Sequence, residues 1–163
     1  MKKMILMLAL VLPIFASAQK IGHVNSQEIM ALMPETKQAG EKLDSLQSSY
    51  ELQLANMQEE FNKKLTEFQQ QQSTMTAGVR EFRQQEIAEM EQRIYIFRET
   101  AQKDIQSKQQ EFLMPIQKRM LDAIQKVGAA EGCTYVFDSM AMLYISPDAL
   151  NLMPLVKKEL GIQ

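Results

Sequence analysis

The chain of 163 residues has one cysteine, one histidine and no tryptophan. A single cysteine, Cys133, cannot form a disulfide bond within the chain. It begins an apolar run, which favours a small buried hydrophobic residue over a free reactive thiol. His23 has no cysteine or acidic cluster at metal-ligand spacing nearby, so a structural role is favoured over a metal-binding one.

Glycine-rich phosphate loops and the G-x-S-x-G nucleophile elbow are also absent from the sequence. Acidic residues such as Asp44, Glu59 and Glu60 fall on a long polar helical pattern, where carboxylates are usually solvated. An enzyme is therefore the weakest of the functions considered. We expect no catalytic residues, no metal and no cofactor.

The first 18 residues have the composition of a secretory signal peptide. Two lysines precede an apolar run over residues 4–15, and a site of small residues ends at Ala18. We expect cleavage between Ala18 and Gln19. The run is shorter than the roughly 20 residues that a membrane-spanning helix needs. The sequence therefore predicts an exported, soluble protein, located in the periplasm if the cell has two membranes.

Basic residues are too few to indicate a nucleic-acid-binding protein. The chain has 18 Lys and Arg against 20 Asp and Glu, and removal of residues 1–18 takes away two lysines and no acid. The exported form would then carry 16 basic and 20 acidic residues, a formal charge of −4. Binding to nucleic acid selects clustered positive charge, so we expect no nucleic-acid partner.

Proline is absent between Pro34 and Pro115, and glycine occurs there only at Gly40 and Gly78. Such a stretch predicts two long helices separated by a turn near residues 74–78. Each arm repeats its apolar positions every 11 residues, a spacing that keeps them on one face of a nearly straight helix. The first arm repeats through Leu43, Leu46, Tyr50, Leu54, Met57, Phe61, Leu65, Phe68 and Gln72, and the second through Met90, Ile94, Phe97, Ala101, Ile105, Lys108, Phe112, Ile116 and Arg119.

The two ends of the chain predict a small body of mixed structure. A strand is expected over 20–24, a short helix capped by Asn25 or Ser26, and a pair of strands over 133–137 and 142–145 that form a hairpin. A final short helix ends at Gly161. The predicted fold is α+β and mostly helical: a strand-containing oligomerisation body of residues 19–34 and 115–163, with a long antiparallel helical hairpin, 35–114, inserted as a coiled-coil tentacle. A body of this size favours an oligomer, because its single core is small.

Apolar residues outside the repeat are the candidates for contact with a partner. Packing within the hairpin explains the repeat itself, but two paired helices cannot bury a second apolar face. The same segments contain adaptable methionines, many of which core filling would also explain. The candidate contact residues are Leu52, Met75, Val79, Phe82, Tyr95, Ile96 and Met114.

Charge is graded along the hairpin. Residues 35–60 carry two bases and six acids, 61–85 four bases and two acids, and 86–114 four bases and six acids. The basic residues of the tip are Lys63, Lys64, Arg80 and Arg83. A slightly positive tip could favour acidic partners or a weak contact with an anionic membrane surface, although ordinary solvated charge is the simpler explanation.

Three short segments near the ends resemble the Skp (OmpH) family of periplasmic chaperones. They are IGHVNSQEI at 21–29 followed by Met-Pro-Glu at 33–35, YVFD at 135–138, and LYISPD at 143–148. These segments occur in the order of that family, with a signal peptide before them and a helical hairpin between them. The resemblance covers essentially all of the chain after the signal peptide.

This resemblance implies a homotrimer whose bodies share a strand-rich core and whose three hairpins enclose a cavity. It also implies an ATP-independent holdase that binds unfolded outer-membrane proteins before their insertion. The best-known members are strongly basic, whereas this chain is acidic with a sequence pI of about 5.5, and no lipopolysaccharide site is carried over. A structural coiled-coil adaptor of the cell envelope is the alternative function.

Overall fold

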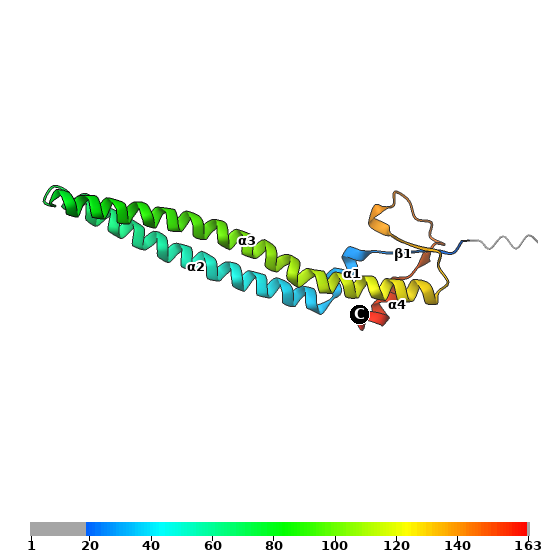
Figure 1. The fold of residues 1–163 in the computed structure, drawn as a ribbon. Helices are drawn as coiled ribbons and strands as arrows, with labels where there is room; N and C mark the ends of the chain where they lie inside the picture. The colour runs from blue at the N-terminus through cyan, green and yellow to red at the C-terminus, as the bar shows by residue number, and fades with distance from the viewer. Residues whose placement is uncertain (1–18, 163) are drawn as a thin grey trace, which may run out of the picture.

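The fold of the computed structural model consists of a small body and one long helical hairpin (Figure 1), and the structure describes residues 19–162. The predicted signal peptide, with Ala18 at its end, lies outside the described residues. No helix of the described part is both long and apolar enough to cross a bilayer.

The hairpin consists of α2 (Pro34–Gln71) and α3 (Ala77–Ala130). At about 1.5 Å per residue, the 38 residues of α2 reach about 57 Å. Helix α3 has 54 residues and continues through Pro115, so its C-terminal part extends past the start of α2 into the body. Gly132, at a φ of 66°, follows the end of this helix, a left-handed conformation that glycine adopts without steric cost.

The 11-residue repeat forms the interface between α2 and α3, as predicted. Met90, Ile94 and Ala101 are buried, and the repeat positions of α2 from Leu43 to Phe68 are half-buried. Tyr50 and Phe97 meet edge to face, with ring centroids 5.8 Å apart. The hairpin therefore holds together through the residues that the spacing selected.

The body contains a three-stranded parallel sheet in the order β2-β1-β3. Its central strand β1 (Ile21–Val24) pairs with β2 (Tyr135–Asp138) on one side and with β3 (Leu150–Asn151) on the other. The N-terminal strand is thus enclosed by two strands from the C-terminal part. A Cβ on Gly22 would lie 2.6 Å from Leu152 Cδ1, so a larger residue at this position would displace the buried Leu152 side chain.

The predicted pairing of 133–137 with 142–145 was wrong, since within the described residues 142–145 belong to no strand. A 3₁₀ turn, η2 (Ser139–Ala141), follows β2, and the Asp138 side chain caps it by accepting a hydrogen bond from the Met140 N–H. The turn directs the chain away from β2, and β3 forms further along against β1. The β-branched and aromatic composition of residues 142–145 indicated an extended backbone, but it did not indicate whether this segment pairs with another strand.

The core lies where α1 (Ser26–Leu32), the end of α3, α4 (Met153–Leu160) and the inner face of the sheet meet. Ile29, Met33, Leu152 and Val156 are almost completely buried. Cys133 is half-buried and packs against this core as a small hydrophobic residue.

Candidate functional site

The off-repeat apolar residues of the hairpin are exposed to solvent. Phe82 is 67% exposed, Leu52 65% and Met114 64%, whereas Ile94 on the repeat is 7% exposed. Val79, Tyr95 and Ile96 are also at least 48% exposed, and Met75 at the tip is half-buried. Exposure of this size costs solubility without contributing to the fold.

These residues lie on more than one surface of the hairpin. Residues two positions apart on a helix point about 200° apart. Leu52 therefore points away from the interface that Leu54 enters, on the outer side of α2. Ile96 likewise points away from the interface that Ile94 enters, on the outer side of α3. Leu52 and Ile96 thus face in opposite directions.

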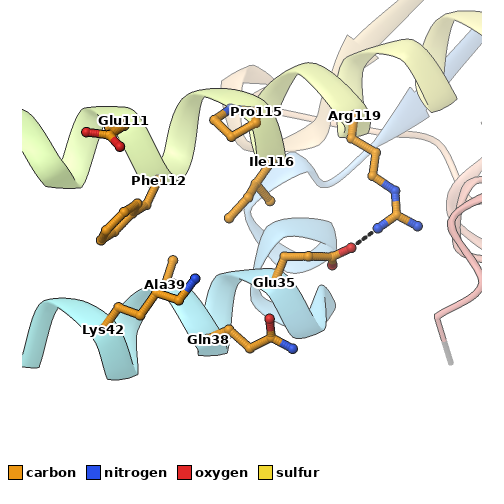
Figure 2. A pocket seen from close by; sticks show the side chains of 9 residues that line it. All are labelled: Glu35, Gln38, Ala39, Lys42, Glu111, Phe112, Pro115, Ile116 and Arg119. Carbon is orange, nitrogen blue, oxygen red and sulfur yellow. Dashed lines mark hydrogen bonds and ion pairs between the residues drawn. The ribbon is translucent and has the colours of Figure 1, made fainter. Parts of the chain in front are cut away.

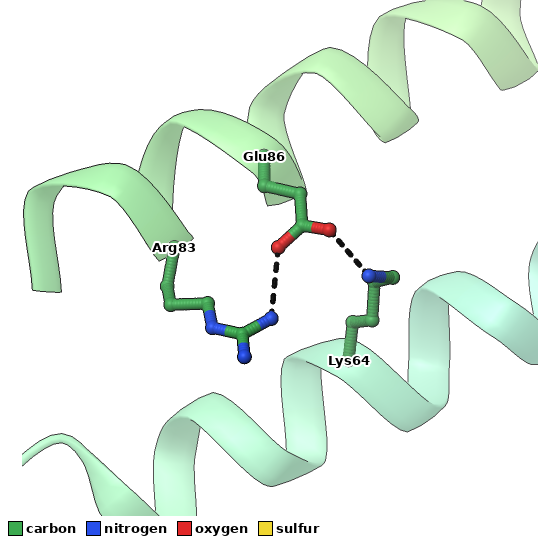
Figure 3. A network of polar contacts seen from close by, with 3 residues as sticks. All are labelled: Lys64, Arg83 and Glu86. Atoms are coloured by element: carbon green, nitrogen blue, oxygen red, sulfur yellow. Dashed lines mark hydrogen bonds and ion pairs between the residues drawn. The ribbon is translucent and has the colours of Figure 1, made fainter. Parts of the chain in front are cut away.

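Two of the four predicted basic tip residues are bound to one carboxylate (Figure 3). Lys64 of α2 donates to Glu86 Oε1 of α3, and Arg83 Nη1 donates to Glu86 Oε2 at 3.0 Å. The hydrogen bond from Lys64, followed by that from Arg83, holds the pKa of Glu86 below its ordinary value. This contact joins the two helices near the tip and neutralises part of the tip charge.

The other two basic tip residues form no ion pair within residues 19–162. Arg80 Nη2 donates to the Met75 carbonyl oxygen at 3.4 Å, and Lys63 is exposed. Val79 and Phe82, at the start of α3, are exposed close to Arg80 in sequence. This end of the hairpin therefore exposes Val79 and Phe82 and also two cations, Lys63 and Arg80, that form no ion pair with any described residue.

A cavity of about 360 Å³ lies where the hairpin meets the body (Figure 2). Pro115 and Ile116 of α3 face Ala39 of α2, and the Glu35–Arg119 ion pair closes the side toward the body. Arg119 Nη2 also donates to the Leu160 carbonyl oxygen at 3.0 Å. Proline has no N–H to donate to the preceding turn, and the packing is loose at this point of the hairpin.

A second concavity, which we call the side groove, runs along one side of the hairpin between α2 and α3. It consists of a hollow of about 410 Å³ and an adjoining hollow of about 240 Å³, and Arg98 lines both. Ala101 occupies a repeat position where other repeats have larger residues, and its small side chain leaves room for the larger hollow. The apolar residues of the side groove are Tyr50, Leu54, Phe61, Ile94, Tyr95, Phe97, Ala101 and Ile105.

The body also exposes apolar residues, which the sequence analysis did not select. Ile21 and Tyr135 are register partners on one face of the sheet, where they are 48% and 52% exposed. The segment after η2 is more exposed still, with Leu143 fully exposed and Tyr144 79% exposed. We call residues 140–144 the apolar arm. Its strand-like composition was the signal available in the sequence.

Comparison with known proteins identifies the family. A family model described as "Outer membrane protein (OmpH-like)" matches residues 20–160. The chain belongs to this OmpH/Skp family. A relative from Pectobacterium atrosepticum, named "Chaperone protein Skp", is 27% identical over 142 residues, which cover 85% of this chain and 86% of the relative. A "Chaperone protein Skp" from Yersinia enterocolitica is 26% identical over 151 residues, or 90% of this chain and 92% of the relative.

A solved structure has the same fold. It is a putative OmpH-like outer membrane chaperone from Caulobacter crescentus, with a TM-score of 0.75 at 15% sequence identity. The match covers 86% of this chain and 82% of that one. This chain and that structure therefore share one fold.

Proposed function

We propose that this chain is an ATP-independent periplasmic holdase that binds unfolded outer-membrane proteins and prevents their aggregation before membrane insertion. The observation that carries the proposal is the set of exposed apolar side chains on several surfaces of a hairpin whose two helices already pack through the repeat. Membership of a family with relatives named chaperone supports it. An unfolded β-barrel precursor exposes alternating apolar residues and pairs its strands with other chains unless they are covered.

The holdase would act as a homotrimer joined through its bodies. Support comes from the exposed sheet face at Ile21 and Tyr135 and from the apolar arm, which a neighbouring subunit could cover. Edge strands β2 and β3 also leave backbone groups free to pair. In this proposal residues 19–34 and 115–163 form the body that joins the subunits, and residues 35–114 form the hairpin that binds the client.

The hairpin tip would make a weak contact with the membrane surface. Exposed Val79 and Phe82 occur at the same end of the hairpin as the cations Arg80 and Lys63, and apolar and cationic residues together are what an anionic interface attracts. Pairing of Lys64 and Arg83 with Glu86 keeps this attraction small.

A structural coiled-coil adaptor is the second candidate, supported by the length of the hairpin and its continuous repeat. An adaptor would bind one defined partner and would not suppress aggregation of unrelated unfolded chains. The two functions therefore differ in an aggregation assay.

The test is the aggregation of an unfolded outer-membrane protein diluted from urea, followed by light scattering without nucleotide. We expect suppression at near-stoichiometric amounts of the protein. Phe82→Glu together with Ile96→Glu should weaken suppression several-fold, because each places a charge where an apolar contact is needed. Gln84→Glu together with Gln92→Glu adds the same charge at exposed polar positions of α3 and serves as the control. Aggregation at the same rate with and without the unmodified protein would refute the holdase function.

A further inference from the structure

The side groove combines aromatic rings with carboxylates. Tyr50, Phe61, Tyr95 and Phe97 line its two hollows, and Glu51 and Glu91 also contribute to the lining, one in each hollow. Rings attract a cation over their faces, and their apolar surface accommodates the aliphatic stem of a lysine or arginine. The same combination already occurs on this hairpin, where Lys42 Nζ lies 5.7 Å from the centroid of the Phe112 ring.

The carboxylates of the side groove, Glu51 and Glu91, are paired with no cation among the described residues. No ion pair within residues 19–162 involves Glu51, Glu91 or Arg98. Glu51 Oε1 accepts a hydrogen bond from the Gln47 side-chain amide at 2.8 Å, which leaves its charge in place. Arg98 offsets one of the two negative charges, which leaves the groove net negative.

The surrounding charge has the same sign. The two hairpin segments that contain all lining residues of the groove except Phe61, namely 35–60 and 86–114, carry six basic and twelve acidic residues together. The potential along this part of the hairpin therefore attracts cations and repels acidic chains, an effect that salt screens.

We infer that the side groove binds extended segments of unfolded clients in which lysine or arginine alternates with apolar residues. From Gln47 to Phe61 the groove follows α2 over 14 helical rises, about 21 Å, which matches about six residues of extended peptide. Apolar and aliphatic parts of the segment lie on the aromatic floor, and its cationic groups pair with Glu51 and Glu91. This client preference rests on the proposed holdase function and specifies the class of segment that the hairpin selects.

The inference is tested by measuring how two fluorescently labelled 12-residue peptides bind to the full exported protein, with fluorescence anisotropy as the readout. Both contain the same apolar residues, alternating with lysine in one peptide and with glutamate in the other. We expect the lysine peptide to bind at least about tenfold more tightly at low salt, with the difference falling as salt is added. Equal binding, preference for the glutamate peptide, or binding of neither peptide would overturn the inference.

Charge variants locate the site. Glu51→Gln with Glu91→Gln should weaken binding of the lysine peptide about fivefold, the size expected for two partly solvated ion pairs. Arg98→Gln should strengthen it. Glu60→Gln with Glu89→Gln is the matched control: it removes the same charge from the hairpin, neither residue lines the groove, and Glu89 accepts an amide from Gln85 as Glu51 does from Gln47. An equal loss in the control would overturn the assignment to the groove.

The aggregation assay separates this inference from the proposed function. A protein that suppresses aggregation of an unfolded outer-membrane protein without preferring the lysine peptide retains the holdase function and loses the inference. A protein that prefers the lysine peptide but leaves aggregation unchanged retains the cationic site and loses the holdase function.

Discussion

Asp138 lies at the end of β2, where its carboxylate accepts hydrogen bonds from two separate segments. The Ser26 hydroxyl, at the start of α1, donates to Oδ2, and the Met140 N–H donates to Oδ1 at 3.0 Å. These bonds, that from Ser26 foremost, hold the pKa of Asp138 below its ordinary value near 3.8. A carboxyl group whose pKa is lower in the folded state than in the unfolded state stabilises the fold at pH values above its ordinary pKa. This contribution is lost as the pH falls through the folded-state pKa.

Asp138→Asn should therefore lower the free energy of unfolding at pH 7 by about 1 kcal/mol, because a neutral amide replaces a hydrogen-bonded carboxylate that is only partly buried. The difference from the parent protein should shrink as the pH is lowered below 3.8. Urea denaturation at a fixed protein concentration measures both values. Asp148→Asn changes an exposed carboxylate and should have little effect at either pH. A deficit of Asp138→Asn that stays constant with pH would contradict the linkage.

The cap of α1 shows what the sequence could not decide at the residue scale. Asn25 and Ser26 are both good N-cap residues, and local spacing does not distinguish them. In the structure Asn25 Oδ1 accepts the Glu28 N–H at 2.9 Å, and the Ser26 hydroxyl is free to bind Asp138. Which of the two residues caps α1 therefore depends on Asp138, which lies 112 positions after Ser26 in the sequence.

Repeat and off-repeat isoleucines of the same helix give a matched test at the scale of the element. Ile94 is 7% exposed at the interface with α2, and Ile96 is 50% exposed on the outer side of α3. Ile94→Ala should cost about 2–3 kcal/mol of stability because it leaves a gap in the interface, whereas Ile96→Ala should cost about 0.5 kcal/mol or less. Denaturation and amide hydrogen exchange of α2 and α3 measure the two effects. Equal losses would show that the repeat does not form the interface.

The elements of this chain differ in how far local sequence determines them. The interface of α2 and α3 could be predicted because an 11-residue period over several turns has one geometric solution. The sheet could not, since β1 pairs with β2 and β3 across more than 100 residues, and short strands carry no information on their partners. The side groove was also missed: it depends on Ala101 lying opposite larger residues of α2, a relation between helices.

At the scale of the whole molecule, the acidic charge of the hairpin and the exposed apolar surfaces of the body suit two different contacts. The first would be made with a client, and the second with another copy of the chain. Excess carboxylates are found in the two hairpin segments near the body, where a client would be held. In the body, the sheet face at Ile21 and Tyr135 and the apolar arm at Leu143 and Tyr144 are exposed and apolar. A surface of that kind fits burial against a second copy of the chain, because a permanent interface excludes charge from its centre.

Leu143→Asp with Tyr144→Asp should therefore dissociate the proposed trimer while leaving the hairpin folded. Burying a carboxylate in an apolar interface costs about 3 kcal/mol, which corresponds to roughly 100-fold weaker association. Sedimentation velocity over a range of concentrations measures the oligomer, and circular dichroism measures the helix content. Ser146→Asp adds a charge to an exposed polar position just beyond the arm and should leave assembly unchanged. If the double variant sediments as the parent protein does, the apolar arm lies outside any subunit interface, and the exposed sheet face must form the proposed interface without it.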